Sequence, residues 1–112
     1  MNLVASDALK LWHRVMIVTL DHKLPDMTQR QFALLLQVYL GPPPHTVRGL
    51  AAELSMSKPA VTRALNRLSA LGFLKRSPDE ADRRSVLVKR TVAGAVFLRD
   101  FADLASGEAR GI

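Results

Sequence analysis

The sequence contains no cysteine among its 112 residues. This absence excludes disulfide bonds, thiolate metal sites, thiol redox sensing and cysteine nucleophiles together. Long apolar runs are also absent, and none approaches the roughly 18 residues that a membrane-spanning helix needs. The N-terminus lacks the basic start, apolar middle and cleavage site of a secretory signal. We therefore expect a soluble protein of the cytoplasm, with no membrane partner.

Motifs of catalysis and of metal or nucleotide binding are missing as well. His13, His22 and His45 are isolated in the sequence, without the paired spacing on one helix that a metal site needs. No glycine-rich phosphate loop leads to a lysine, and no serine or aspartate stands in a nucleophile-elbow or triad-like motif. The sequence predicts no enzyme, no metal and no cofactor.

The sequence does have positive charge, concentrated in one segment. Of the 16 lysines and arginines, nine lie between Lys58 and Arg90, together with three of the ten acidic residues. This segment carries the whole net charge of +6, because the rest of the chain is balanced. Such a concentration is the electrostatic footprint of a protein that binds a polyphosphate, and a solvated basic surface is the alternative.

Hydrophobic periodicity predicts a mainly α-helical chain with one small β-hairpin. Apolar residues recur at helical spacing in five segments, residues 6–22, 28–40, 46–54, 57–71 and 91–105. Thr28 and Gln31 have the spacing of a capping box, and Ser57 is expected to cap the fourth helix. Gly41–Pro44 forms a rigid connector that no helix can cross, and Gly72 ends the fourth helix.

The predicted core consists of the apolar faces of these helices. The second helix is expected to bury Phe32, Leu35, Leu36 and Tyr39, and the fourth Val61, Leu65, Leu68 and Leu71. Two short strands, residues 73–76 and 85–89, are expected to pair across a polar loop at residues 77–84.

Residues 46–65 meet the physical requirements of a helix-turn-helix. Four apolar residues can hold its two helices at a steep angle: Leu50, Leu54, Val61 and Leu65. Ala51 is small enough for the helices to approach closely, and Met56 can fill the turn. This packing leaves one face of the second helix free to enter the major groove of DNA.

The free face of that second helix carries residue types that bind DNA. If the apolar stripe points inward, the outward or flanking residues are Ser57, Lys58, Thr62, Arg63, Asn66 and Arg67. Arginine suits guanine, asparagine suits adenine, and hydroxyls suit phosphates or bases. A solvated amphipathic helix is the alternative, but such faces usually mix charges, and no acidic residue lies between Lys58 and Leu71. We predict a DNA-binding face on which Arg63 and Asn66 read bases.

The charged loop of the hairpin is predicted to be a wing. Arg83 and Arg84 are expected to enter the minor groove beside the recognition helix. Asp79 and Asp82 can pair with these arginines, or with an arginine of the recognition helix, and fix the shape of the loop. A solvated turn is the alternative.

The run from Leu68 to Val92, LSALGFLKRSPDEADRRSVLVKRTV, resembles the wing signature of the MarR family of bacterial transcription regulators. The segment Thr28–Phe32 is similar to the helix opening that precedes the motif in that family. The resemblance covers residues 28–94 well. It implies a winged helix-turn-helix homodimer that binds a pseudo-palindromic operator in double-stranded DNA, usually as a repressor.

Two features of the sequence depart from the family pattern. Ala81 stands where family wings often carry an arginine, and the C-terminal helical region is short. Many members have a longer dimer region there, with a ligand pocket beside it. The sequence therefore leaves open whether a small-molecule effector binds this protein.

In that family the N- and C-terminal helices form the dimer interface. Both terminal helices of this chain are more apolar than one small core needs, through Leu9, Trp12, Met16, Phe97 and Phe101. Closure of the chain's own core is the alternative. The expected organisation is one domain, residues 1–112, with dimerisation helices at 6–22 and 91–105, a helix-turn-helix at 46–72 and a wing at 73–90.

Three functions are compatible with these features. A dimeric, sequence-specific regulator of transcription is favoured. A winged-helix module that binds a protein partner would need an exposed apolar patch in place of the basic recognition face. A non-specific nucleoid-type or single-strand binder would show steep salt dependence but little discrimination between sequences, so a specificity ratio separates it from the first.

Overall fold

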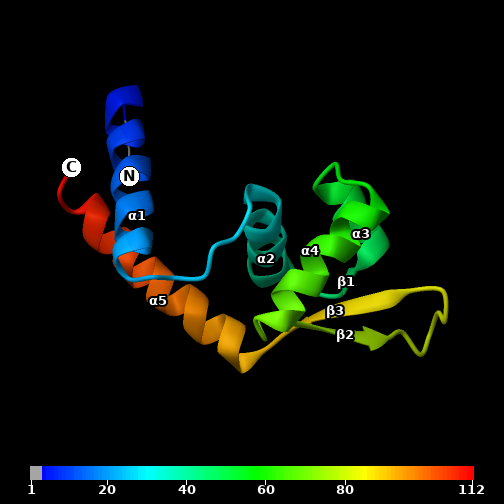
Figure 1. The fold of residues 1–112 in the computed structure, drawn as a ribbon. Helices are drawn as coiled ribbons and strands as arrows, with labels where there is room; N and C mark the ends of the chain where they lie inside the picture. The colour runs from blue at the N-terminus through cyan, green and yellow to red at the C-terminus, as the bar shows by residue number, and fades with distance from the viewer. Residues whose placement is uncertain (1–3) are drawn as a thin grey trace. The chain divides into compact units, whose positions relative to one another are not determined.

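The structure is a computed structural model that describes residues 4–112. These residues form, in order, α1 (Ala5–Asp21), α2 (Gln29–Leu40), β1 (His45–Thr46), α3 (Val47–Glu53), α4 (Lys58–Ala70), β2 (Leu74–Pro78), β3 (Val86–Arg90) and α5 (Val92–Ala109) (Figure 1). They divide into two compact units. One unit is Met27–Val96, and the other combines the described residues up to Asp26 with Phe97–Ile112.

The start of α2 and both ends of α4 lie where the sequence predicts them. Thr28 Oγ1 accepts a hydrogen bond from the Gln31 N–H at 3.1 Å, and Gln31 Oε1 accepts one from the Thr28 N–H at 3.0 Å, which confirms the capping box. Ser57 Oγ accepts a hydrogen bond from the Ala60 N–H at 3.2 Å and caps α4. Gly72 follows α4 with φ of 78°, a conformation that glycine adopts without the steric cost of a side chain.

The core of the unit Met27–Val96 lies among α2, α3, α4 and the sheet. Its large, fully buried side chains are Leu34, Leu35, Val38, Leu50, Val61, Leu65, Leu68 and Leu74. The prediction for α4 is confirmed for Val61, Leu65 and Leu68, whereas Leu71 follows the helix as its C-cap and is only half-buried. Each fully buried aliphatic side chain contributes about 1.5–3 kcal/mol by leaving water.

The prediction for α2 is partly wrong. Leu35 is buried, but Leu34 and Val38 complete the buried face, whereas Phe32, Leu36 and Tyr39 are only half-buried. Most residues from Phe32 to Leu40 are apolar, so periodicity alone could not decide which side of this helix turns toward α4.

The three strands form one antiparallel sheet in the order β1-β3-β2. The register pairs His45 with Val88 in the first ladder and Leu74 with Arg90 in the second. β1 was not predicted, because two residues after a proline-rich connector carry no alternation pattern. β2 and β3 also extend beyond the predicted residues 73–76 and 85–89, since their pairing continues to Pro78 and Arg90.

A hydrogen-bonded joint connects the end of α4 to the start of α5. The Tyr39 hydroxyl lies 2.9 Å from the Phe73 carbonyl oxygen and accepts a hydrogen bond from the Thr91 N–H at 3.0 Å. Thr91 Oγ1 donates to the Gly72 carbonyl at 2.6 Å and accepts from the Gly94 N–H at 3.0 Å, so Thr91 opens α5 as predicted.

The other unit contains α1 and most of α5. Arg14 Nη1 donates to the Gly111 carbonyl at 2.8 Å, and the rings of Phe97 and Phe101 stack with centroids 6.4 Å apart. α5 continues to Ala109, beyond the predicted end at residue 105. Among residues 4–112, no helix combines the length and the apolar character that a membrane crossing requires.

α1 has no buried residue. Several of its large apolar side chains face solvent: Leu9 is 73% exposed, Trp12 67% and Leu20 69%. These residues and Met16 follow one another at intervals of three or four positions, so they form a stripe along one side of the helix. An exposed stripe of this kind is unusual for a helix that only covers its own core.

Candidate nucleic-acid interface

α4 separates an apolar face from a polar one. Its buried residues Val61, Leu65 and Leu68 recur every three or four positions and turn to the core. All six residues predicted for the free face are exposed: Ser57, Lys58, Thr62, Arg63, Asn66 and Arg67. The residues that the sequence assigns to a DNA-binding face therefore lie on the solvent side of one helix.

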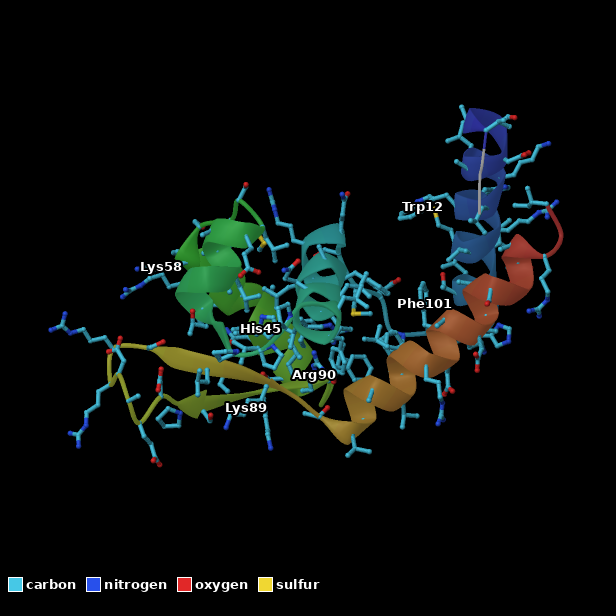
Figure 2. The ribbon with its side chains drawn as sticks, turned by 180° about the vertical axis from the view of Figure 1, so that it is seen from behind. Trp12, His45, Lys58, Lys89, Arg90 and Phe101 are labelled. Atoms are coloured by element: carbon cyan, nitrogen blue, oxygen red, sulfur yellow. The ribbon has the colours of Figure 1, made fainter. Side chains whose placement is uncertain are left out.

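The first turn of α4 adds a favourable field for an anion. No acidic residue lies in this turn, and Lys58 points outward from it (Figure 2). A helix N-terminus carries a partial positive charge, and its first amides have no partner within the helix. Ser57 satisfies one of these amides, so its hydroxyl stabilises the helix as well as lying on the exposed face.

Two aspartate side chains order the loop between β2 and β3 by accepting hydrogen bonds from its backbone. Asp79 Oδ1 accepts a hydrogen bond from the Ala81 N–H at 3.0 Å, and Asp82 Oδ1 accepts one from the Arg84 N–H at 3.0 Å. The prediction that these aspartates pair with Arg83 or Arg84 is not met, because within residues 4–112 no ion pair joins them. Each aspartate side chain instead binds the amide of the residue two positions further along the chain, which is a usual role of aspartate in turns.

The two wing arginines are left at the surface. Arg83 and Arg84 are both exposed, and the hairpin that carries them extends past α3 and α4 (Figure 1). The hairpin and the polar face of α4 belong to the same compact unit. This arrangement supplies a helix for a major groove and a loop with two exposed arginines for the backbone or groove beside it.

The sequence analysis did not assign several basic side chains of this unit to the DNA-binding surface. Arg48 is exposed in the first turn of α3, and Lys75 lies directly opposite Lys89 across β2 and β3. Two lysines in this position repel each other, so an anion near them would be stabilising. Only the strand register reveals this pairing, because 14 positions separate the two residues in the chain.

Arg90 has a structural role that the sequence did not indicate. Its Nε donates to the Val38 carbonyl at 3.0 Å, and its Nη2 donates to the Gly41 carbonyl at 3.1 Å. The guanidinium also lies 5.7 Å from the centre of the Tyr39 ring. Arg90 therefore satisfies free carbonyls at the end of α2, a contact that spans 52 positions and leaves no local signal.

The described residues show no group of three or more histidine, aspartate or glutamate side chains that could hold a metal ion. His45 is buried, with its Nε2 3.2 Å from the Gly41 carbonyl oxygen. His13 and His22 are exposed on or beside α1. The chemistry that the structure offers is therefore a polar and basic surface in the unit Met27–Val96.

Known proteins with the same fold include regulators crystallised with and without DNA. A mutant of MarR from Escherichia coli, in complex with operator DNA, matches with a TM-score of 0.70 at 28% identity, over 94% of this chain and 69% of that one. The transcriptional regulator Tm0710 from Thermotoga maritima matches with a TM-score of 0.67 at 26% identity, over 93% and 68%. Both support a winged helix-turn-helix fold.

Comparison of the amino-acid sequence with known proteins identifies relatives of the same kind. The multiple antibiotic resistance protein MarR of Escherichia coli (strain K12) is 39% identical over 72 residues, which are 64% of this chain and 49% of the relative. The match thus spans about half the length of that relative. The sequence profile of the MarR family matches residues 26–85, which include α2, α3, α4, β2 and the loop after β2. This chain belongs to the MarR family.

Proposed function

We propose that this protein is a homodimeric regulator of transcription that binds a pseudo-palindromic operator in double-stranded DNA, most simply as a repressor. The observation that carries the proposal is the exposed, acid-free face of α4 beside a basic wing. A relative with the same fold has been crystallised with operator DNA, which supports this reading.

In the proposed complex α4 lies in the major groove. Arg63 and Asn66 contact base edges, because both are exposed one turn apart and carry the groups that read guanine and adenine. Ser57, Lys58, Thr62 and Arg67 surround them and contact phosphates or sugars. Arg83 and Arg84 approach the adjacent minor groove from the wing.

The nucleic-acid surface is tested first on DNA of random sequence. Fluorescence anisotropy of a labelled duplex is measured as the salt concentration rises. We expect binding at low salt that weakens linearly on a logarithmic plot, because each phosphate contact releases counterions. The absence of binding at low salt would contradict the proposal and turn attention to a protein partner.

Replacing both wing arginines tests the second contact. The variant Arg83→Ala/Arg84→Ala should bind its operator about tenfold more weakly, equivalent to ~1.4 kcal/mol, with the largest loss at sites that have A·T-rich flanks. Anisotropy titrations against two operators that differ only in their flanks measure both effects. The control is Glu80→Ala, which removes an exposed negative charge from the same loop and should not weaken binding. Unchanged affinity in the arginine variant would exclude the wing from the interface.

The proposed dimer rests on the exposed stripe of α1. Leu9, Trp12, Met16 and Leu20 present an apolar surface that no described residue buries. A second copy of the chain would remove this surface from water, at about 25 cal/mol per Å² of apolar area. Symmetric homodimers are the commonest oligomers, and their symmetry matches that of a palindromic site.

A charge placed in this stripe should dissociate the dimer. Sedimentation velocity at micromolar concentration should give the wild type about twice the 12.3 kDa mass of one chain, and Trp12→Glu should give one chain mass. The matched control is Lys10→Glu, which places a negative charge on an exposed residue of the same helix outside the stripe and should remain dimeric. A monomeric wild type would refute the dimer.

A further inference from the structure

A single residue, Thr91, separates the end of β3 from the start of α5. One residue has only two soft backbone dihedrals, so the conformation of Thr91 sets the direction in which α5 begins. The helix starts in the unit Met27–Val96 and continues without a break from Phe97 into the other unit. A contact that fixes Thr91 therefore fixes the direction in which α5 leaves the first unit.

All three polar groups of Thr91 are held by other parts of the unit Met27–Val96. The N–H donates to the Tyr39 hydroxyl at 3.0 Å, and the carbonyl oxygen lies 3.0 Å from the same hydroxyl. The Thr91 hydroxyl donates to the Gly72 carbonyl at 2.6 Å and accepts from the Gly94 N–H at 3.0 Å. Tyr39 belongs to α2 and Gly72 follows the C-cap of α4, so the start of α5 is tied to both helices.

The Tyr39 hydroxyl is the centre of this joint. It accepts a hydrogen bond from the Thr91 N–H, and its one proton is within reach of the carbonyl oxygens of Phe73 and Thr91. Gly94 permits the close approach, because a Cβ atom there would overlap the hydroxyl. Phenylalanine at position 39 would keep the ring and lose all three contacts, so the effect of the hydroxyl can be measured apart from the packing of the ring.

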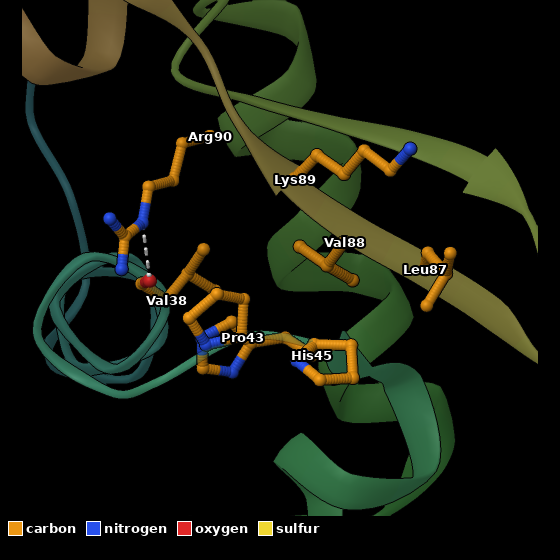
Figure 3. A pocket seen from close by; sticks show the side chains of 8 residues that line it. Val38, Pro43, His45, Leu87, Val88, Lys89 and Arg90 are labelled. Atoms are coloured by element: carbon orange, nitrogen blue, oxygen red, sulfur yellow. Dashed lines mark hydrogen bonds between the residues drawn. The ribbon is translucent and has the colours of Figure 1, made fainter.

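Arg90 holds the ring that carries this hydroxyl. It is the last residue of β3, and its Nε donates to the Val38 carbonyl at the end of α2 (Figure 3). Its guanidinium lies 5.7 Å from the centre of the Tyr39 ring, at the distance of a cation–π contact. The residue next to Thr91 thus contacts the ring whose hydroxyl binds Thr91, and both contacts oppose a rotation of Tyr39 away from the joint.

We propose that Tyr39 is a positioning residue for operator binding, because its hydroxyl fixes the direction of α5 and thereby the half-site spacing that the dimer accepts. This inference rests on the proposed function, in which α5 leads to the dimer interface and α4 enters the major groove. One added base pair moves a half-site by about 3.4 Å along the DNA and rotates it by roughly 35°. Two α4 helices held at one separation cannot follow this change unless the joint yields.

The variant Tyr39→Phe should relax the required spacing and leave the DNA contacts intact. Anisotropy titrations use the selected operator, the same operator with one base pair inserted between its half-sites, and a duplex with a single half-site. We expect the insertion to weaken binding of the wild type at least thirtyfold and of Tyr39→Phe less than fivefold. Affinity for the single half-site should be equal in both proteins, because the exposed residues of α4 and the wing are unchanged.

A matched control separates positioning from stability. Thr28→Ala removes the capping hydroxyl at the other end of α2 and destabilises the same helix without touching Thr91. At a temperature where all three proteins are folded, this variant should keep the wild-type penalty for the insertion. The wild-type penalty in Tyr39→Phe would overturn the inference. A wild type without any specific operator would instead refute the proposed function, and a measurement without DNA then decides the role of Tyr39.

That measurement is the distance between the two α4 helices of the DNA-free dimer. The chain has no cysteine, so Ala70→Cys at the exposed end of α4 takes one spin label per copy. Double electron–electron resonance should give a narrow distance distribution in the otherwise wild-type protein and with Thr28→Ala, and one at least twice as wide with Tyr39→Phe. Thr91→Val, which removes the other hydroxyl of the joint, should widen it too and replaces Tyr39→Phe if that variant does not fold. Equal widths in all variants, or a broad distribution in the wild type, would overturn the proposal.

Discussion

Replacing Arg63 with alanine should lower affinity for the operator by about 1–3 kcal/mol and relax the preference at one base position. Arg63 is exposed on the polar face of α4, where its guanidinium can form two hydrogen bonds with guanine. The measurement is a set of anisotropy titrations against the operator and against variants that carry each of the other bases at one position.

The pattern of loss separates base reading from phosphate binding. If Arg63 contacts a phosphate, Arg63→Ala should weaken binding equally on all sequences and reduce the salt slope by about 1. The control is Arg99→Ala, which removes an exposed arginine of α5 that lies 3.5 Å from Asp100. That variant should retain operator affinity, since Arg99 lies outside the proposed interface.

Replacing Gly94 with alanine should destabilise the protein by about 3 kcal/mol or more. A Cβ atom at this position would overlap the Tyr39 hydroxyl and the Phe73 carbonyl oxygen, the two groups that join the end of α4 to the start of α5. The methyl group can be accommodated only if Tyr39 moves and its hydrogen bonds break. Urea or thermal unfolding measures the loss, expected as a fall in Tm of ~12 °C or more.

A second glycine in the same helix provides a matched control. Gly107 also lies in α5, but a Cβ atom there would meet only Arg110 Nη2 at 3.5 Å. Gly107→Ala should therefore stabilise the protein by up to about 1 kcal/mol, because alanine has the higher helix propensity. In a double-mutant cycle, Gly94→Ala and Tyr39→Phe should cost less together than the sum of their separate costs. A loss below about 1 kcal/mol for Gly94→Ala would contradict the close packing at this joint.

The parts of the fold that were predictable depend on local rules. The capping box of Thr28 and Gln31, the Ser57 cap and the positive φ of Gly72 each involve residues a few positions apart. The exposed face of α4 was predictable for the same reason, since Val61, Leu65 and Leu68 mark the buried side of a regular helix and leave Arg63 and Asn66 opposite.

Features that depend on distant parts of the chain were missed. β1 exists only because β3 offers it a partner, and Arg90 reaches the end of α2 across 52 positions. The Asp–Arg pairs expected in the wing do not form, because a backbone amide is nearer to each aspartate than an arginine side chain is. The buried face of α2 could not be derived from a helix that is apolar on most sides.

The exposed stripe of α1 and the domain organisation were only partly predictable from the sequence. The exposed stripe of α1 is legible in the sequence as an excess of apolar residues, but only the structure shows that no described residue covers it. The organisation as one domain, 1–112, remains a prediction, as does the assignment of the two terminal helices to a dimer.

Selection of binding sites from a pool of random duplex DNA, at near-physiological salt, tests the proposed regulator most directly. We expect enrichment of an inverted repeat whose half-sites are about 10 base pairs apart, because two copies of α4 related by a twofold axis would enter successive major grooves on one side of the DNA. Failure to enrich any sequence, with binding that collapses as salt rises, would contradict sequence-specific recognition and leave a non-specific DNA-binding protein.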